Sequence, residues 1–345
     1  MTAADWKVDT WDALDGVADP AAQSGPLIGH EDARAMLARN FASGRMHHAW
    51  LLSGPRGIGK ASLAFRAAEH FFRNPDQDEA PAAISLVDDS VHSLVAKGGH
   101  PNLLVLRRPW DEKSKKFRTA IGVDEVRRTL GFFGTAAERG TWRVCIVDPA
   151  DDLTNAAANA LLKVLEEPPP RTVFFIIAHT PRGLLATIRS RCRTLSLKPL
   201  GEDELLQALD NQPAVAGMTD DERRRLAALA RGSVRRALLL AGSASIASFE
   251  TFVHNVEAPA PDWTAIHKLA SAISIPSKAG EFDLFIELVY DYLSERISGN
   301  GASLASRYRW TGIWEDLQKS VSRMEGWNMD RKQVILGLFD RMQAA

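Results

Sequence analysis

The chain has 345 residues, of which 45 % are hydrophobic and 25 % are charged, and its formal net charge is −1. This composition is that of an ordinary globular protein with room for about two or three domains. It excludes a chain-wide basic field of the kind that concentrates nucleic acid, so any contact with DNA would be local or made through partners. Only two cysteines occur, Cys145 and Cys192, and they lack C-x-x-C spacing, which argues against a disulfide framework and a cysteine zinc site.

The first 25 residues are polar and rich in Ala, Asp and Gly, which predicts an extended N-terminal arm over residues 1–25. This segment lacks the apolar core of a signal peptide. The longest apolar runs, such as VFFIIA, are too short to span a bilayer. We therefore expect no contact with a membrane and a cytoplasmic location.

Strand and helix patterns alternate from residue 26 onward. One helical pattern carries Val123, Val126, Leu130 and Phe133 on a single face. Short apolar strands are predicted at residues 49–53, 102–108, 143–148, 173–178 and 193–199. Strands that alternate with helices predict an α/β domain over 26–199, with a largely parallel sheet covered on both faces.

The strand patterns stop at about residue 200. Short helical patterns follow at 203–209, 221–230 and 234–242. Longer amphipathic segments then run to the end of the chain, and one of them places Phe282, Phe285, Val289 and Tyr292 on one face. This predicts a small helical domain over 200–243 and a second, all-helical domain over 244–345.

The stretch SGPRGIGKASLA fits the phosphate-loop pattern G-x-x-x-x-G-K from Gly54 to Lys60, with Gly57 and Gly59 inside it. It follows an apolar strand and precedes a helix, as a phosphate loop does. In such a loop, backbone N–H groups and the helix N-terminus hold phosphate, and the lysine neutralises it. The next residue is Ala61, where the pattern requires a hydroxyl for magnesium. The alternative interpretation is a glycine-rich turn without a ligand.

The predicted strand at 143–148 ends in Asp148, which suits magnesium, but the residue after it is Pro149. A hydrolysing site has an acid there to position the attacking water. Asp151 and Asp152 follow, and they are more simply explained as the start of the next helix. The sequence therefore lacks two independent catalytic groups.

Basic residues recur in two further segments. Arg189, Arg191 and Arg193 alternate, which in an extended segment places all three on one side, and spacing alone predicts only a solvated rim. Arg235 follows Gly-Ser-Val and could face a phosphate from a helix start, although a basic helix start explains it equally well. The stretch RRPWDEKSKKFRTAI predicts a charged surface hairpin rather than a DNA contact.

Taken together, HAWLLSGPRGIGK, NAAANALLKVLEEPP, LLATIRSRC and GSVRRAL resemble the clamp-loader branch of the AAA+ ATPases. The order and spacing match from about residue 27 to 240. The resemblance implies a phosphate-loop AAA+ domain, a small helical lid domain and an all-α C-terminal collar that oligomerises.

The resemblance also assigns roles to particular residues. It implies that Arg191, with Ser190 and Cys192 of the same motif, is an arginine finger that acts in trans on ATP bound by a neighbouring motor subunit. Arg235 resembles the sensor-two arginine, which acts in cis. The family's nucleotide-binding positions fall here on Gly54, Gly57, Gly59, Lys60, Asp148 and Arg235.

With Ala61 and Pro149, the resemblance implies a non-hydrolysing stator that helps load a sliding clamp on primed DNA. Its own ATPase and polymerase activities are expected to be absent, although it would be part of a DNA polymerase holoenzyme. The implied partners are motor subunits of the gamma/tau type and delta-type subunits in a hetero-oligomer, with the sliding clamp and primed DNA reached through the complex.

No cofactor is required for this role, and weak ATP or ADP binding without turnover stays open. Some family members insert four zinc-binding cysteines after the phosphate-loop helix, and this chain has none there, so we expect no zinc and no metal site. The alternative function is an active AAA+ ATPase, either a clamp-loader motor or a branch-migration helicase. A small-molecule kinase fits less well, because the long helical C-terminal region suits association.

Overall fold

A computed structural model describes residues 19–23, 25–85, 87–134, 140–210, 212–299, 303–327 and 330–344. The chain divides into two compact units, Met1–Leu238 and Leu239–Ala345. Most of the expected N-terminal arm lies outside the described residues. Within the described part of that arm, a 3-10 turn (η3, Pro20–Ala22) buries Ala21.

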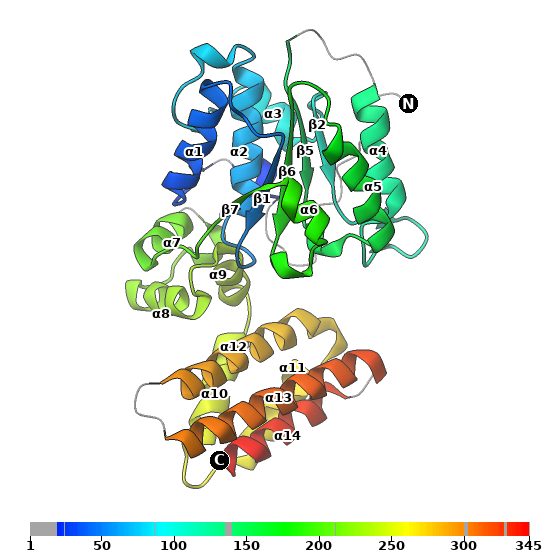
Figure 1. The fold of residues 1–345 in the computed structure, drawn as a ribbon. Helices are drawn as coiled ribbons and strands as arrows, with labels where there is room; N and C mark the ends of the chain where they lie inside the picture. Colours follow the sequence, from blue (N-terminus) through cyan, green and yellow to red (C-terminus); the bar gives the residue numbers. More distant parts are fainter. Residues whose placement is uncertain are drawn as a thin grey trace. The chain divides into compact units, whose positions relative to one another are not determined.

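The first unit is built on a five-stranded sheet (Figure 1). Its strands are β1 (Ala49–Ser53), β2 (Leu103–Leu106), β5 (Arg143–Val147), β6 (Thr172–Ala178) and β7 (Arg193–Ser196). The spatial order is β2-β5-β6-β1-β7, and all neighbours are parallel. β1, β5 and β6 are buried along their whole length, as expected of central parallel strands covered on both faces. This confirms the predicted fold class.

Helices cover both faces of the sheet (Figure 1). Because side chains alternate along a strand, Trp50 and Leu52 face one core, and Ala49 and Leu51 face the other. The first core is closed by α1 (Glu31–Ala42), α2 (Lys60–Arg73) and α3 (Ser90–Ala96). The second is closed by α4 (Val123–Gly134), α5 (Asn155–Glu166) and α6 (Ala186–Arg191).

A short antiparallel hairpin extends from the exit of β2. It pairs β3 (Trp110–Asp111) with β4 (Lys116–Phe117), and the rings of Trp110 and Phe117 pack edge to face at 5.1 Å. Lys115 and Glu112 at its tip are highly exposed and ion-paired. The predicted charged hairpin is thus confirmed.

Small helices complete the first unit, namely α7 (Glu202–Leu209), α8 (Asp220–Ala230) and the first part of α9 (Val234–Ala241). The second unit then contains α10 (Ser245–Glu257), α11 (Trp263–Ile273), α12 (Ala279–Ser298), α13 (Leu304–Trp327) and α14 (Arg331–Gln343). Short 3-10 turns lie at Gln77–Glu79 (η4), Ala150–Asp152 (η5), Pro181–Gly183 (η6), Pro213–Val215 (η7) and Pro276–Lys278 (η8).

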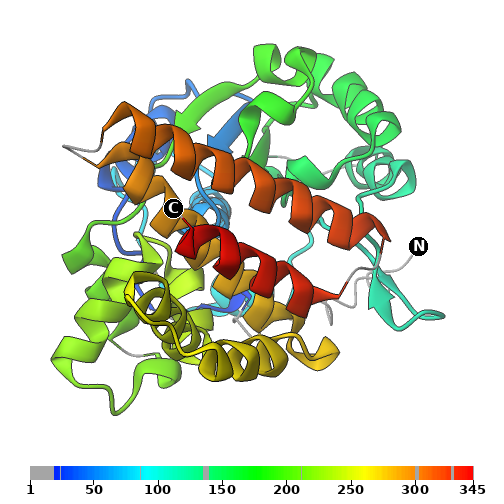
Figure 2. The same cartoon turned by 90° about the horizontal axis from the view of Figure 1, so that it is seen from below.

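The second unit has its own aromatic core. Phe252 of α10 packs edge to face on Phe285 of α12 at 5.3 Å and on Phe339 of α14 at 5.6 Å. Figure 2 looks onto α13 and α14, which run side by side. The predicted face of α12 is buried at Phe282, Phe285 and Val289. Among the described residues, no single helix is long and apolar enough to cross a bilayer, and α9 and α10 reach that length and composition only when taken together.

Candidate functional site

The predicted phosphate loop joins β1 to α2, as its sequence requires. Gly54, Gly57 and Gly59 all have positive φ values, of 147°, 78° and 98°. A Cβ atom at Gly54 would lie 2.4 Å from the carbonyl oxygen of Leu197, and one at Gly57 would lie 2.4 Å from the hydroxyl of Ser233. The glycines at these two positions are therefore needed for the loop to close against the rest of its own chain.

Lys60, the first residue of α2, is 3 % exposed. Its Nζ donates hydrogen bonds to the carbonyl oxygens of Gly54, at 2.7 Å, and Pro55. Burial lowers the pKa of Lys60 to about 8, although the negative charges of Asp148 and Asp151 oppose this shift. The ammonium group thus donates its hydrogen bonds to carbonyl oxygens of the loop to which it belongs.

Asp148 follows β5, and its carboxylate is held by Arg107, which directly follows the neighbouring strand β2. Oδ2 of Asp148 lies 3.3 Å from Nη2 of Arg107, and Nη1 of Arg107 lies 3.1 Å from Oδ2 of Asp19. Burial raises the pKa of Asp148, and the guanidinium of Arg107 acts against that rise. Sequence reasoning missed Arg107 and Asp19, because they are 41 and 129 residues from Asp148 in the chain.

The expectation that Asp151 and Asp152 start the next helix is wrong. They lie in η5, and α5 is capped by Thr154, whose side chain accepts from the N–H of Ala157. The carboxylate of Asp151 instead accepts from the backbone N–H groups of His179 and Thr180, both at 2.7 Å. A carboxylate with two such donors ties the segment after β5 to the end of β6.

The small helices reach the phosphate loop through the start of α9. The hydroxyl of Ser233 donates to the carbonyl oxygen of Arg56 at 3.0 Å, and the backbone N–H of Arg235 donates to the carbonyl oxygen of Gly57 at 3.3 Å. The N–H of Arg236 donates to the Ser233 hydroxyl at 3.2 Å. The backbone of Arg235 thus contacts the loop, and sequence reasoning missed Ser233.

Arg191 is the last residue of α6, and its side chain is 35 % exposed. Nη2 of Arg191 lies 2.6 Å from Oε1 of Glu166, and Nη1 donates to the carbonyl oxygen of Thr187 at 3.1 Å. The hydroxyl of Ser190 donates to the same carbonyl oxygen at 3.0 Å. Cys192 is half-buried, and burial raises the pKa of its thiol to about 12.

The prediction that Arg189, Arg191 and Arg193 share one side of an extended segment is wrong. Arg189 and Arg191 lie in α6, where Nη1 of Arg189 donates to the carbonyl oxygen of Pro181. Only Arg193 is in a strand, and its guanidinium lies 5.1 Å from the ring centre of Trp50. The chain becomes extended only at Cys192. The three arginine side chains therefore contact different groups.

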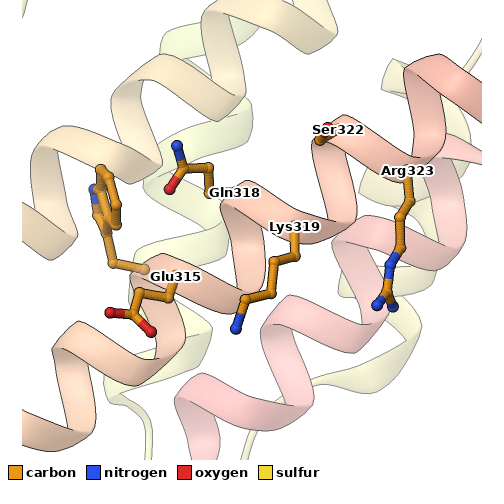
Figure 3. A pocket seen from close by; sticks show the side chains of 6 residues that line it. Glu315, Gln318, Lys319, Ser322 and Arg323 are labelled. Atoms are coloured by element: carbon orange, nitrogen blue, oxygen red, sulfur yellow. The ribbon is translucent and has the colours of Figure 1, made fainter.

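A wide surface hollow of about 570 Å³ lies along α13 in the second unit (Figure 3). It is lined by Trp314, Glu315, Gln318, Lys319, Ser322 and Arg323. It contains none of the predicted site residues. Over the described parts of the chain, no three or more His, Cys, Asp or Glu side chains are grouped so as to hold a metal ion.

The sequence matches known proteins over most of its length. Residues 29–201 match the family model described as DNA polymerase III, delta subunit. DNA polymerase III subunit delta′ of Pseudomonas aeruginosa is 32 % identical, over 84 % of this chain and 86 % of the relative. The delta′ subunit of Escherichia coli is 29 % identical over 87 % and 83 %, and the tau subunit of the same organism is 32 % identical over 63 % and 32 %.

Solved structures match more distantly. A DNA polymerase III gamma-subunit-related protein from Thermotoga maritima aligns at 16 % identity and a TM-score of 0.42, over 90 % of this chain and 99 % of the other. A RuvB variant from the same organism aligns at 18 % identity and a TM-score of 0.42, over 81 % and 80 %.

A phosphate loop between a strand and a helix of a five-stranded parallel sheet, with small helices that contact the loop, defines a phosphate-loop α/β protein. The match of residues 29–201 and the delta′ relatives that align along most of their length narrow this class to one family. The chain belongs to the family of DNA polymerase III delta′ subunits.

Proposed function

We propose that this chain is a clamp-loader subunit that does not hydrolyse ATP and that donates Arg191 in trans to ATP on a neighbouring motor subunit. One observation carries the proposal. Lys60 and Arg107 at its own phosphate site are bound within the chain, whereas the guanidinium of Arg191 keeps an exposed side at the end of α6.

The chain's own loop does not fit metal-dependent hydrolysis. Ala61 has no hydroxyl for magnesium, and Pro149 has no carboxylate to position water. Asp148, the remaining candidate magnesium ligand, is paired with Arg107. Binding of ATP or ADP at Gly54 to Lys60 would still be favoured by the N-terminus of α2, but it is not required for the proposed role.

Arg191 suits an arginine finger by its chemistry and its place. A guanidinium is always charged and presents a planar fork of donors that matches a phosphate group. When the γ-phosphoryl group transfers, negative charge spreads over its oxygens, and a positioned guanidinium stabilises that charge. Ser190 and Cys192 flank Arg191 and shape the end of α6, without a separate chemical role.

The proposed partners follow from the relatives. These are delta′, tau and gamma subunits of DNA polymerase III, which supports a place in a hetero-oligomeric clamp loader. In this proposal the unit Leu239–Ala345 is the oligomerising collar, and the first unit faces a gamma/tau-type motor. The sliding clamp and primed DNA are reached through the complex in the cytoplasm. The alternative, an active motor or helicase, is disfavoured by Ala61 and Pro149.

The test is ATP turnover by the reconstituted complex with the clamp and primed DNA present. We expect Arg191→Ala to slow hydrolysis by at least about 100-fold at the ATP site that this chain completes, because arginine fingers contribute about 10³ to 10⁵ in rate elsewhere. Lys60→Ala should leave turnover nearly unchanged, and both variants should assemble. ATP hydrolysis by the isolated chain, or loss of turnover in Lys60→Ala, would show instead that this chain is a motor.

A further inference from the structure

Glu166 is the acidic partner of Arg191 and the last residue of α5. Its Oε1 lies 2.6 Å from Nη2 of Arg191, and its side chain is 49 % exposed. The two helices that carry the pair are fixed by packing, since Leu165 of α5 and Ile188 of α6 are buried in one core cluster. The backbones on both sides of this ion pair are therefore held by the fold.

The position of Glu166 is not explained by the stability of α5. Glu166 and Glu167 lie at the C-terminal end of that helix, where the helix dipole favours cations and disfavours carboxylates. Where a protein departs from such a local preference, a functional or strained site is expected. The guanidinium of Arg191 adds a positive charge at this helix end, where Lys163 of the last turn is the other cation.

The hydrogen bonds of Arg191 leave some of its N–H groups available to a ligand. A guanidinium has five N–H groups. To the described residues, Arg191 makes one hydrogen bond from Nη1, to Thr187, and one from Nη2, to Glu166. Both terminal nitrogens are thus anchored, and three N–H groups remain for an anion that approaches the exposed side.

We propose that Glu166 is a positioning residue for Arg191, which holds the guanidinium in one orientation before it meets the phosphate of the neighbouring subunit's ATP. This inference rests on the proposed finger role of Arg191. A long arginine side chain loses rotamer freedom when it is fixed, and a carboxylate that fixes it beforehand removes that cost from the reaction. The effect of Glu166 is therefore on the rate of hydrolysis, not on assembly.

The chain offers a matched control in Glu167, an exposed carboxylate one residue further on. Glu166→Gln keeps the size of the side chain and one acceptor oxygen but removes the charge, and Glu167→Gln makes the same change beside it. An exposed ion pair contributes little to folding stability, so neither variant should change the thermal midpoint appreciably. If Glu166 served only the stability of the fold, Glu166→Gln would therefore leave kcat unchanged as well.

The experiment measures kcat and KM for ATP in the full reconstituted complex, with the clamp and primed DNA. We expect Glu166→Gln to lower kcat about 3- to 10-fold without change in KM or assembly, and Glu167→Gln to match the wild type. Glu166→Asp should recover part of the rate, because it restores the charge. Glu166→Gln should add nothing in an Arg191→Ala background, since it acts only through that residue.

A second measurement does not depend on the partners. Side-chain ¹⁵N NMR of the free chain should show slow rotation of the Arg191 guanidinium, and faster rotation in Glu166→Gln but not in Glu167→Gln. If Arg191→Ala leaves turnover unchanged, the finger role and this inference both fail. If Arg191→Ala slows turnover but the two glutamine variants behave alike, only the role of Glu166 fails. A higher kcat in Glu166→Gln would also overturn it, because the carboxylate would then restrain the finger.

Discussion

The phosphate loop and the end of α6 differ in how their cations are held. At the loop, Lys60 is buried and bonded to carbonyl oxygens of its own loop, and Arg107 is paired with Asp148 and Asp19. At the end of α6, Arg191 keeps an exposed edge, although Glu166 and Thr187 anchor it. A phosphate-loop fold can therefore keep its shape while the cations at the loop bind groups of the same chain, and a cation elsewhere, Arg191, keeps an exposed side.

The largest effect is expected from Arg107→Ala, which removes the partner of the buried Asp148. Leaving a buried carboxylate without its cation should cost about 3 kcal/mol of unfolding free energy. Arg127→Ala is the control, because Arg127 forms an exposed pair with Asp124 and should change stability by less than about 0.5 kcal/mol. Urea unfolding of both variants measures the difference.

The loss in Arg107→Ala should also depend on pH. Burial raises the pKa of Asp148 above its ordinary value, and removal of Arg107 raises it further. Since the folded state then binds the proton more tightly than the unfolded state, protonation stabilises the fold as the pH falls through that range. The deficit should therefore shrink at acidic pH. An equal deficit at neutral and acidic pH would mean that Arg107 stabilises the fold through packing rather than through its charge.

An intermediate effect is expected from the titration of Lys60. Burial lowers its pKa to about 8 in the folded chain, compared with 10.5 in the unfolded chain. Between these values the unfolded state binds more protons, so the wild type should gain about 2 kcal/mol of stability as the pH rises from about 7 to 10. Lys60→Met lacks this titration and should not show the gain. If the two pH profiles run parallel, Lys60 is not held in the buried state described here.

The sheet and its covering helices could be predicted because their signals are local. Apolar runs such as VFFIIA bounded by turns specify central strands, and the spacing from Gly54 to Lys60 specifies the loop. Local patterns predict burial less well at the margin of a helix's buried face. Leu130 continues the helical apolar pattern of α4, yet it is 64 % exposed, because it lies at the margin of the buried face that Val126 occupies.

The charge pairs could not be predicted, because they join residues that are distant in sequence. Arg107 meets Asp148 only since β2 and β5 are neighbours in the sheet, and Glu166 meets Arg191 only since α5 packs on α6. Sequence spacing shows which residues share an element, but not which elements become neighbours. The role of a phosphate-loop cation therefore depends on the topology as well as on the motif.

The smallest effect is expected from Ser233→Ala. This change removes the hydrogen bond to the carbonyl oxygen of Arg56 and the acceptor for the N–H of Arg236, which should cost about 1 kcal/mol. Ser298→Ala is the control, because its hydroxyl also bonds a backbone carbonyl, that of Ser294, but lies in α12. Amide hydrogen exchange then measures the phosphate loop and the end of α6 separately. We expect faster exchange at residues 56–59 and no change in exchange at residues 186–191, because only the loop depends on this contact. Faster exchange at both would mean that the loop and the end of α6 loosen together, so that Arg191 is coupled to the phosphate loop rather than independent of it.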